Sequence, residues 1–505
     1  MALLQWLSML LLLIISMVSY SSSQIDPWDR VPIILNRIKA PIFPARTCDV
    51  TSYGAIRSGS NDVEAPSNVV DMNAKAFEDA INDCNILGGG TVYVPSGTFI
   101  TSAITLKSNI SLHISAEAVV RFTKEISRYP TVFTRWEGIE LMNYSPLIYA
   151  FEVENIAITG SGLLDGNADC NTWWNWRNYC ANSTANQNAD RDTLFKMAEN
   201  NVTVSERIFG LGHYLRAQFI QPYRSKNVLI EGVTVVNSPM WIIHPVLCEN
   251  VIIRNINLTS LGPNNDGIDP ESCTDVWITG VLFNSGDDDI AIKSGRNADG
   301  RRINVPSQNF VIQNCTMLDG HGGITLGSEI SGGVKNVFVE DCYLDSPRLD
   351  TAIRVKNNAM RGGTLEDFYV RNVRVGQVAK QVIEVDFYYD EGSNGGYRPV
   401  LRDYIIENVN VLNGAPYSLF IRGFPDHPRT SYIGITLRNI SFTGLRNSPH
   451  YVLEEVDYIS ANDITVDGKS WNVQSSSSAK FVNFKMLFCK ASLVQILTIV
   501  VRIRL

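Results

Sequence analysis

The chain has 505 residues, of which 45% are hydrophobic and 19% are charged, and its formal net charge is −8. This apolar content excludes a chain that is disordered throughout, and the acidic balance argues against a general nucleic-acid binder, which would present a basic face. A chain of this length can also bury a large core without needing a metal or a disulfide framework to fold.

The first residues have the composition of a targeting segment. Residues 1–25 carry no charged side chain, and their apolar run ends in the small residues Ser19, Ser21, Ser22 and Ser23. This pattern is typical of a signal peptide, expected here over residues 1–23, with a short membrane anchor as the alternative. Residues 24–47 would then form an N-terminal extension of a secreted protein.

Two further features favour the secretory route. Seven Asn-x-Ser/Thr sequons are candidate glycosylation sites. They begin at Asn109, Asn143, Asn182, Asn201, Asn257, Asn314 and Asn439. An oxidising compartment would let some of the nine cysteines pair, and Cys170 with Cys180 could close a short loop. The pairing does not follow from the sequence, and buried free thiols are the alternative.

One helix is predicted, over Asn73 to Leu87. Its apolar residues follow helical spacing, and three consecutive glycines end it. These apolar residues are Ala76, Phe77, Ala80, Ile81 and Cys84. We interpret this helix as the cap over the open end of a repetitive core.

From residue 155 onward a short strand pattern recurs, in which Asn or Asp precedes alternating apolar residues and a further Asn or Gly. Successive copies begin at Asn227, Asn250, Asp275, Asn309, Asn336 and Asp367. These starts lie 23, 25, 34, 27 and 31 residues apart. Because one such repeat cannot bury its own apolar face, neighbours must stack, and the spacing leaves little room for propeller blades. The pattern predicts an all-β solenoid, a parallel β-helix, with positive-φ turns at the Asn and Gly positions.

The solenoid converts sequence spacing into distance, because strands of adjacent coils lie about 4.8 Å apart. Polar residues recur at gaps of 22, 22, 33 and 33, at His244, Asp266, Asp288, His321 and Arg354. The first two gaps fit single coils, and the longer ones fit coils with inserted loops. We therefore expect these side chains to share one face.

Three carboxylates, Asp266, Asp287 and Asp288, converge in this arrangement. Like charges this close push their pKa values apart, so one carboxyl can donate a proton while the others activate water. That division of labour suits glycoside hydrolysis. Plain turns and a calcium site are the alternatives, since Asp is common in turns and carboxylates bind hard cations.

Four motifs, in this order and spacing, resemble the signature of the polygalacturonases, glycoside hydrolase family 28. They are Asn265-Asp266, Gly286-Asp287-Asp288, Gly320-His321-Gly322 and Arg354-Val355-Lys356. The resemblance spans roughly residues 48–468 and is nearest to the plant polygalacturonase-like branch. It implies a right-handed parallel β-helix catalytic domain over residues 48–470, with a short N-terminal capping helix. The implied activity is inverting, metal-free hydrolysis of α-1,4-galacturonosyl bonds in pectin.

The same resemblance implies roles for individual residues. Asp287 would be the general acid, Asp266 and Asp288 would activate water, and His321 would tune the acid and contact the sugar. The implied substrate-binding residues are Asn265, Arg354, Lys356 and His244. For Arg354 there is also a reason independent of the resemblance to expect substrate binding, because the fork-shaped guanidinium matches a uronate carboxylate. We expect no metal or cofactor, and a monomer that acts on pectic galacturonan in the cell wall, with neither nucleic-acid binding nor stable membrane association.

Some positions depart from the family pattern. Asn265 stands where Thr is usual, and Asp289 stands where Cys is frequent, which would add a negative charge beside the acid. No Tyr closely follows the Arg354-x-Lys356 strand; Tyr388 and Tyr389 come later. A tryptophan cluster at residues 173–176 could stack on sugars, although packing of its loop is favoured.

Three other functions stay open at this point. A calcium-dependent pectate lyase would release an unsaturated product that absorbs ultraviolet light. A rhamnogalacturonan hydrolase would use a related substrate, and a non-catalytic wall-binding β-helix would show a broken carboxylate set. The end of the chain, residues 471–505, is an atypical tail with five basic residues and no acidic one from residue 480 onward. Its apolar stretch is too short to span a bilayer, and we assign it no role in the fold.

Overall fold

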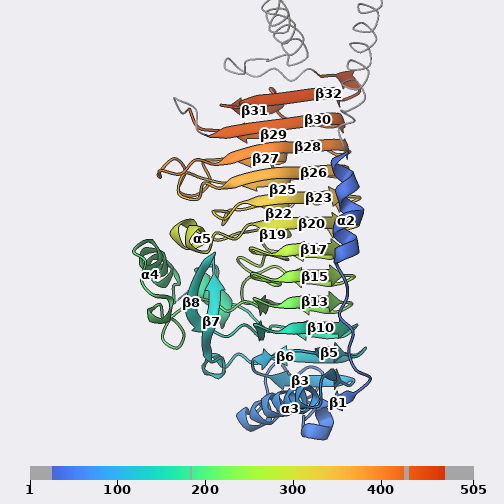
Figure 1. Ribbon diagram of the computed structural model, residues 1–505, viewed down its shortest axis with the longest axis vertical. Coiled ribbons are helices and arrows are strands. Elements are labelled where there is room, and N and C mark those ends of the chain that lie inside the picture. The colour runs from blue at the N-terminus through green and yellow to red at the C-terminus, as the bar shows by residue number, and fades with distance from the viewer. Residues whose placement is uncertain (1–25, 182, 184, 426–430, 472–505) are drawn as a thin grey trace, which may run out of the picture.

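The computed structural model describes residues 26–181, 183, 185–425 and 431–471 (Figure 1). The predicted signal peptide and residues 472–505 of the predicted tail lie outside this range. Within it, no helix has the length and apolar character needed to cross a membrane.

The described chain stacks parallel strands into a long β-helix, which confirms the predicted fold class (Figure 1). One ladder runs through β10 (Glu154–Gly160), β13 (Lys226–Glu231), β15 (Glu249–Arg254), β17 (Thr274–Thr279), β20 (Ser307–Gln313), β23 (Val334–Glu340), β26 (Thr364–Val375), β28 (Val400–Val411), β30 (Tyr432–Phe442) and β32 (Tyr458–Val466). A second comprises β19 (Ile290–Ile292), β22 (Gly320–Leu326), β25 (Leu349–Lys356), β27 (Gln381–Asp386), β29 (Tyr417–Arg422) and β31 (Tyr451–Glu454). The predicted repeats correspond to successive strands of the first ladder.

The core forms because equivalent residues of successive coils stack in register. Val228 pairs with Val251, Val251 with Val276, and Val276 with Phe310. All four side chains are buried. Each such burial contributes about 1.5–3 kcal/mol relative to exposure, and only stacked neighbours provide it.

The predicted turns with positive φ are confirmed. Asn227, Asn250 and Asn309 have φ of 55°, 58° and 62°. Their side chains also form a ladder, in which the Nδ2 of Asn250 donates to the Oδ1 of Asn227 at 2.6 Å. Asn suits this position because it tolerates the left-handed region of φ and ψ. Its side-chain amide can also form a hydrogen bond with the side-chain amide of the equivalent Asn one coil away.

The capping helix α3 (Ser67–Ile86) closes one end of the stack, as predicted, but begins six residues earlier than expected (Figure 1). It starts directly after Pro66, and of its first six residues only Val70 is buried, so the apolar periodicity gave no signal there. A disulfide between Cys48 and Cys84 ties the helix to β1 (Thr47–Asp49).

The N-terminal extension packs on the outside of the first ladder. Helix α2 (Arg30–Arg37) runs along the long axis of the stack and crosses successive strands (Figure 1). It buries Ile34 in an apolar cluster to which Leu229, Ile252 and Phe338 of the strands contribute. Because these residues point outward from the β-helix core, the extension covers apolar surface that the strands alone would expose.

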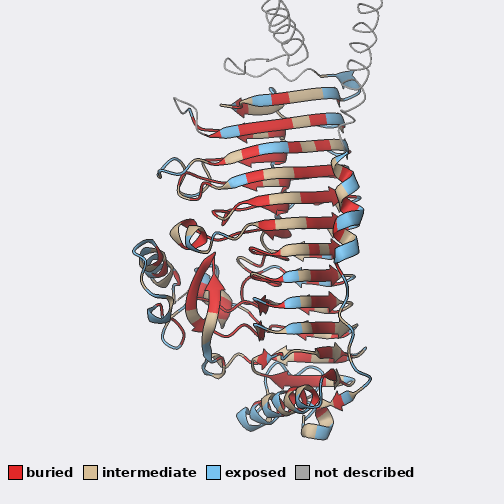
Figure 2. Ribbon diagram, in the orientation of Figure 1, coloured by how far each residue is buried: buried red, intermediate tan, exposed pale blue. Residues whose placement is uncertain are grey.

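A hairpin and two helices project from the side of the stack (Figure 1). They are β7 (Thr131–Trp136), β8 (Ile139–Tyr144), α4 (Asn188–Glu199) and α5 (Asn297–Ile303). The hairpin strands are largely buried (Figure 2). The neighbouring loop is closed by the Cys170–Cys180 disulfide, and Trp173 and Trp176 pack inside it against aromatic neighbours, in agreement with the packing interpretation.

Candidate active site

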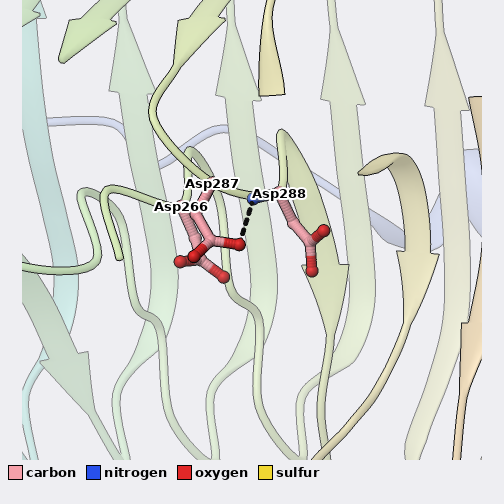
Figure 3. A group of neighbouring side chains, drawn as sticks. All are labelled: Asp266, Asp287 and Asp288. Carbon is pink, nitrogen blue, oxygen red and sulfur yellow. Dashed lines mark hydrogen bonds between the residues drawn. The ribbon is translucent and has the colours of Figure 1, made fainter. Parts of the chain in front are cut away.

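Coil stacking brings Asp266, Asp287 and Asp288 together. The backbone N of Gly267 donates to the carbonyl of Asp288 at 2.9 Å, which fixes the two coils side by side. One oxygen from each of the three carboxyl groups lies within 4.8 Å of the others. Figure 3 shows the three side chains gathered at one place, with the backbone N of Asp288 donating to Asp287 Oδ1 at 3.0 Å.

Asp287 is paired with His321. The Oδ1 of Asp287 lies 2.9 Å from the Nδ1 of His321, whose side chain is 52% exposed. Burial pushes the pKa of Asp287 upward, but the hydrogen bond and charge of His321, with the charges of Lys356 and Arg354, outweigh burial and hold that pKa below its usual range. The same hydrogen bond and the charge of Asp287 raise the pKa of His321. The shared proton of this pair is therefore favoured on His321.

Asp288 lies beneath the surface and is bound by two cations. Its side chain has no exposed surface. Lys356 Nζ donates to Asp288 Oδ2, and Arg354 Nη1 lies 3.5 Å from Oδ1. Lys356 and Arg354 come from the same strand, β25, two residues apart, so both point to one side of it.

Asp266 lies in surroundings that favour its protonated form. Burial, followed by the charges of Asp269 and Asp287, raises its pKa well above the usual range. Burial also raises the pKa of Asp269, against the opposing charge of Lys293. Lys293 Nζ lies 3.9 Å from Asp266 and 3.4 Å from Asp269. The pKa values of the carboxyls are therefore pushed apart, as expected, but the pKa is raised at Asp266 and lowered at Asp287.

His244 is not a surface residue, which corrects the predicted substrate contact. Its side chain is fully buried, with Nε2 2.9 Å from Glu271 Oε2 and Nδ1 3.0 Å from Gln221 Nε2. Both ring nitrogens are thus occupied inside the protein. The coil spacing correctly placed His244 one coil before Asp266, but its side chain points into the interior of the protein.

Asn265 is also buried, and its predicted role in substrate binding is wrong for the same reason. Its Oδ1 accepts from Ser260 Oγ at 2.6 Å, and its Nδ2 donates to the carbonyl of Met240 at 3.1 Å. This amide shapes the turn that presents Asp266. The extra charge expected at Asp289 is likewise not supported, because burial raises its pKa well above the usual range and favours the neutral acid.

Sequence reasoning missed several residues of the site. Lys293, Arg296 and Glu329 line the cavity beside the carboxylates. Tyr389 also lines it, with Lys356 Nζ 5.2 Å from its ring centroid, so an aromatic residue does adjoin the Arg354 strand. For Lys293 a signal existed, since it follows Glu271 by 22 residues, one coil, and the two pair across adjacent coils.

A parallel β-helix with grouped carboxylates beside buried cations fits a class, the solenoid glycoside hydrolases. Residues 214–413 match the model of glycosyl hydrolases family 28. The crystal structure of a hyperthermoactive exopolygalacturonase from Thermotoga maritima is 39% identical, covers 90% of this chain and 100% of its own, and superposes with a TM-score of 0.82. The chain belongs to glycosyl hydrolases family 28 and is an enzyme that acts on glycosidic bonds.

Other relatives agree with this assignment. A probable polygalacturonase of Vitis vinifera is 27% identical over 419 residues, which cover 79% of this chain and 74% of the relative. A polygalacturonase from Erwinia carotovora ssp. carotovora, 19% identical with a TM-score of 0.60, shares the fold; the match covers 83% of this chain and 98% of that structure.

Proposed function

We propose that this enzyme hydrolyses α-1,4-galacturonosyl bonds of pectin, with Asp287 as general acid and Asp266 holding the attacking water. The names of the relatives indicate galacturonan as the substrate. The observation that carries the proposal is the pairing of Asp287 with His321 beside two cations, Arg354 and Lys356. A proton donor and uronate-binding groups thus adjoin the same bond.

The proton for the leaving oxygen comes from the His321–Asp287 pair. When a uronate chain binds, its negative charge and the exclusion of water favour protonation of Asp287, and His321 supplies the proton. Asp287 then protonates the glycosidic oxygen as the bond to the anomeric carbon breaks. Asp266, once ionised, accepts a proton from water as the water attacks that carbon. Asp288 was also predicted to activate water, but its side chain has no exposed surface; we assign it instead to holding Arg354 and Lys356 in place.

Arg354 supplies the charge for the neighbouring sugar. Its side chain is 15% exposed, and a Cβ built at Gly322, the residue after His321, would lie 3.2 Å from the Cδ of Arg354. A guanidinium binds a carboxylate through two parallel hydrogen bonds, so a uronate is favoured over a neutral sugar. This supports a galacturonan over a rhamnogalacturonan, in which neutral sugars alternate with uronates.

The cationic side chains around the three carboxylates argue against a calcium-dependent lyase. Cations already hold the oxygens that a calcium ion would need: Lys356 and Arg354 are on Asp288, and His321 is on Asp287. Lys293 adjoins Asp266. A divalent ion at the centre would face these four positive groups, whereas hydrolysis uses them.

The test is product analysis on unesterified polygalacturonate. Reducing ends should accumulate without ultraviolet absorbance, and chelator should leave the rate unchanged. Absorbance near that of a conjugated uronate, lost on adding chelator, would overturn the proposal in favour of the lyase. Proton NMR of fresh product tests the stereochemistry, since inversion of an α-bond gives the β-anomer first. This check matters because the carboxyl oxygens lie closer than the roughly 6.5–9.5 Å common in inverting enzymes.

The activity should show a bell-shaped dependence on pH. The acidic limb should lie above the ordinary carboxyl pKa of 3.8, because Asp266 must lose a proton and its pKa is raised. The alkaline limb should lie above 6.5, because the raised pKa of His321 keeps the proton on the pair up to higher pH. Initial rates across pH give both limbs as properties of the coupled groups. An alkaline limb below 6.5 would contradict the proton-store role.

Replacing Arg354 with Ala should raise KM for oligogalacturonate about 10- to 100-fold, because a charged hydrogen bond of about 1.5–3 kcal/mol is lost. Arg402→Ala is the control, since that side chain is exposed and pairs with Glu366 on another strand of the first ladder. Initial-rate kinetics on unesterified and methyl-esterified oligomers separate the effects. An equal loss on both substrates would mean that Arg354 does not bind the carboxylate.

A further inference from the structure

Arg216 carries a guanidinium group that is fully buried near the carboxylates. Its Nε donates to Gln187 Oε1 at 2.9 Å, and its Nη2 donates to Asn264 Oδ1 at 2.7 Å. Its Nη1 donates to two backbone carbonyls, those of Pro239 and Pro263. None of these four acceptors is a carboxylate, whereas a buried charge is usually paired with an opposite charge.

The charge of Arg216 interacts instead with acids of the site through space. Burial, followed by the charge of Arg177, lowers the pKa of Arg216 to about 9. The charges of Glu137, Asp266 and Asp287 oppose this shift. The guanidinium therefore stays charged at neutral pH. Burying such a charge costs stability, and an apolar side chain of similar volume could fill the same space, so its presence beside the acids indicates a role in their chemistry.

The side chain of Asn264 connects Arg216 to the carboxylates. Its Oδ1 accepts from Arg216 and also from Arg177 Nε at 3.1 Å, and its Nδ2 donates to Asp287 Oδ2 at 3.4 Å. An amide turned the other way would direct its NH₂ group at two guanidinium donors. The arginines therefore leave only one orientation of the amide, in which its NH₂ group faces Asp287.

Asp287 is thereby held at both of its carboxyl oxygens. Its Oδ1 lies 2.9 Å from His321 Nδ1 and accepts from the backbone N of Asp288 at 3.0 Å (Figure 3). Its Oδ2 accepts from Asn264. Contacts at both oxygens limit rotation of the carboxyl group about its bond to Cβ. This matters for a general acid, because proton transfer depends on the alignment of the acid with the leaving oxygen.

Arg216 is itself fixed by segments that are far apart in the sequence. The two backbone carbonyls that it binds follow β14 (Thr234–Val236) and β16 (Asn257–Ser260), which are paired strands of adjacent coils. Gln187 directly precedes α4. The carbonyl of Arg216 accepts from Trp136 Nε1 of the hairpin at 3.1 Å. A planar fork with acceptors on three segments has one position, which the single Nζ of a lysine cannot reproduce.

We propose that Arg216 is a positioning residue, which orients the amide of Asn264 onto Asp287 and so aligns the general acid with the bond to be cleaved. This inference rests on the proposed function. Because Arg216 is fully buried, it does not touch the substrate. Its replacement should therefore act on kcat rather than on KM.

Replacing Arg216 with Lys should lower kcat on oligogalacturonate about 10- to 100-fold and leave KM within about twofold of wild type. Lysine keeps the charge, so this variant isolates the loss of the fork geometry. Arg207→Lys is the matched control, because Arg207 is only 1% exposed but pairs with Asp299 of helix α5 at 2.9 Å. Its kcat should stay within about twofold of wild type.

Initial-rate kinetics, with the thermal midpoint of each variant, decide the outcome. A wild-type kcat for folded Arg216→Lys would overturn the inference and leave the proposed function intact, and so would a rise in KM without a fall in kcat. A wild-type enzyme that cleaves no pectic oligomer would refute the proposed function itself.

A double-mutant cycle shows whether Arg216 acts through Asn264. Asn264→Gly removes the amide and suits the left-handed backbone, whose φ is 54°. In this background, adding Arg216→Lys should lower kcat by less than about twofold further. Losses that multiply would overturn the inference, because Arg216 would then act by another route. If Arg216→Lys does not fold, Asn264→Gly alone is measured, and a wild-type kcat for that variant would also overturn the inference.

Discussion

Replacing Asp287 with Asn should lower kcat on oligogalacturonate at least 100-fold while the fold is retained. The amide has the shape of the carboxylate but cannot deliver a proton to the glycosidic oxygen, and a proton-transfer group typically contributes 10²- to 10⁴-fold in rate. The side chain is only 17% exposed, so an isosteric change avoids a cavity. Initial rates on pure oligomers, together with the thermal midpoint, measure both expectations.

Asp275→Asn is the matched control for this variant. Asp275 starts a repeat on the first ladder and pairs with Arg37, far from the carboxylate cluster in the fold. Its φ is 58°, and the equivalent positions Asn250 and Asn309 already carry Asn, so the backbone accepts the change. Its kcat should stay within about twofold of wild type. If Asp287→Asn retained turnover within tenfold of the wild type, Asp287 would not be the acid.

Replacing Arg135 with Met should destabilise the protein by about 3–5 kcal/mol, because it breaks a buried ion pair and leaves charge without compensation. The Arg135 and Glu271 side chains are both fully buried and lie 3.1 Å apart, and Glu140 lies 3.7 Å from Arg135. Glu140 keeps Arg302 as a partner, so the main loss falls on Glu271. Met fills similar space, which limits the contribution of a cavity.

The measurement is urea unfolding of the variant against wild type, with Arg402→Met as control. That exposed pair with Glu366 should contribute less than about 1 kcal/mol. A loss at Arg135 no larger than at Arg402 would mean that the hairpin is held by apolar packing alone.

Much of the fold could be predicted from sequence because the β-helix is repetitive. Each repeat carries the same local signals, apolar alternation and an Asn or Asp turn, and stacking follows since no repeat buries its own face. The grouping of the carboxylates follows equally, because a gap of 22 residues between Asp266 and Asp288 is one coil. The start of α3 was less accurate, because only Val70 is buried in its first six residues.

Side-chain direction was not predictable from coil spacing. His244 and Asp266 are one coil apart, yet Asp266 lines the cavity and His244 is bound inside by Glu271 and Gln221. Within a turn, the backbone can direct a side chain either toward the cavity or into the protein interior. Hydrogen-bond partners that are distant in sequence decide which of the two directions is adopted. Lys293 was missed for a related reason, since its acidic neighbours Asp266, Asp269 and Glu329 come from the two coils on either side of it.

The sequence by itself determined the solenoid, its turns and the convergence of three acids, since each depends on patterns shorter than one coil repeated along the chain. Only the tertiary structure decided which side chains line the cavity beside the carboxylates and which carboxyl has its pKa raised. The hairpin, α4 and the loops around Arg296 carry no repeat, and they meet through ion pairs such as that of Arg296 with Glu137, which are 159 positions apart. Charges buried at such contacts interact through space, so their pKa values and the cavity they enclose depend on distances that no local pattern encodes.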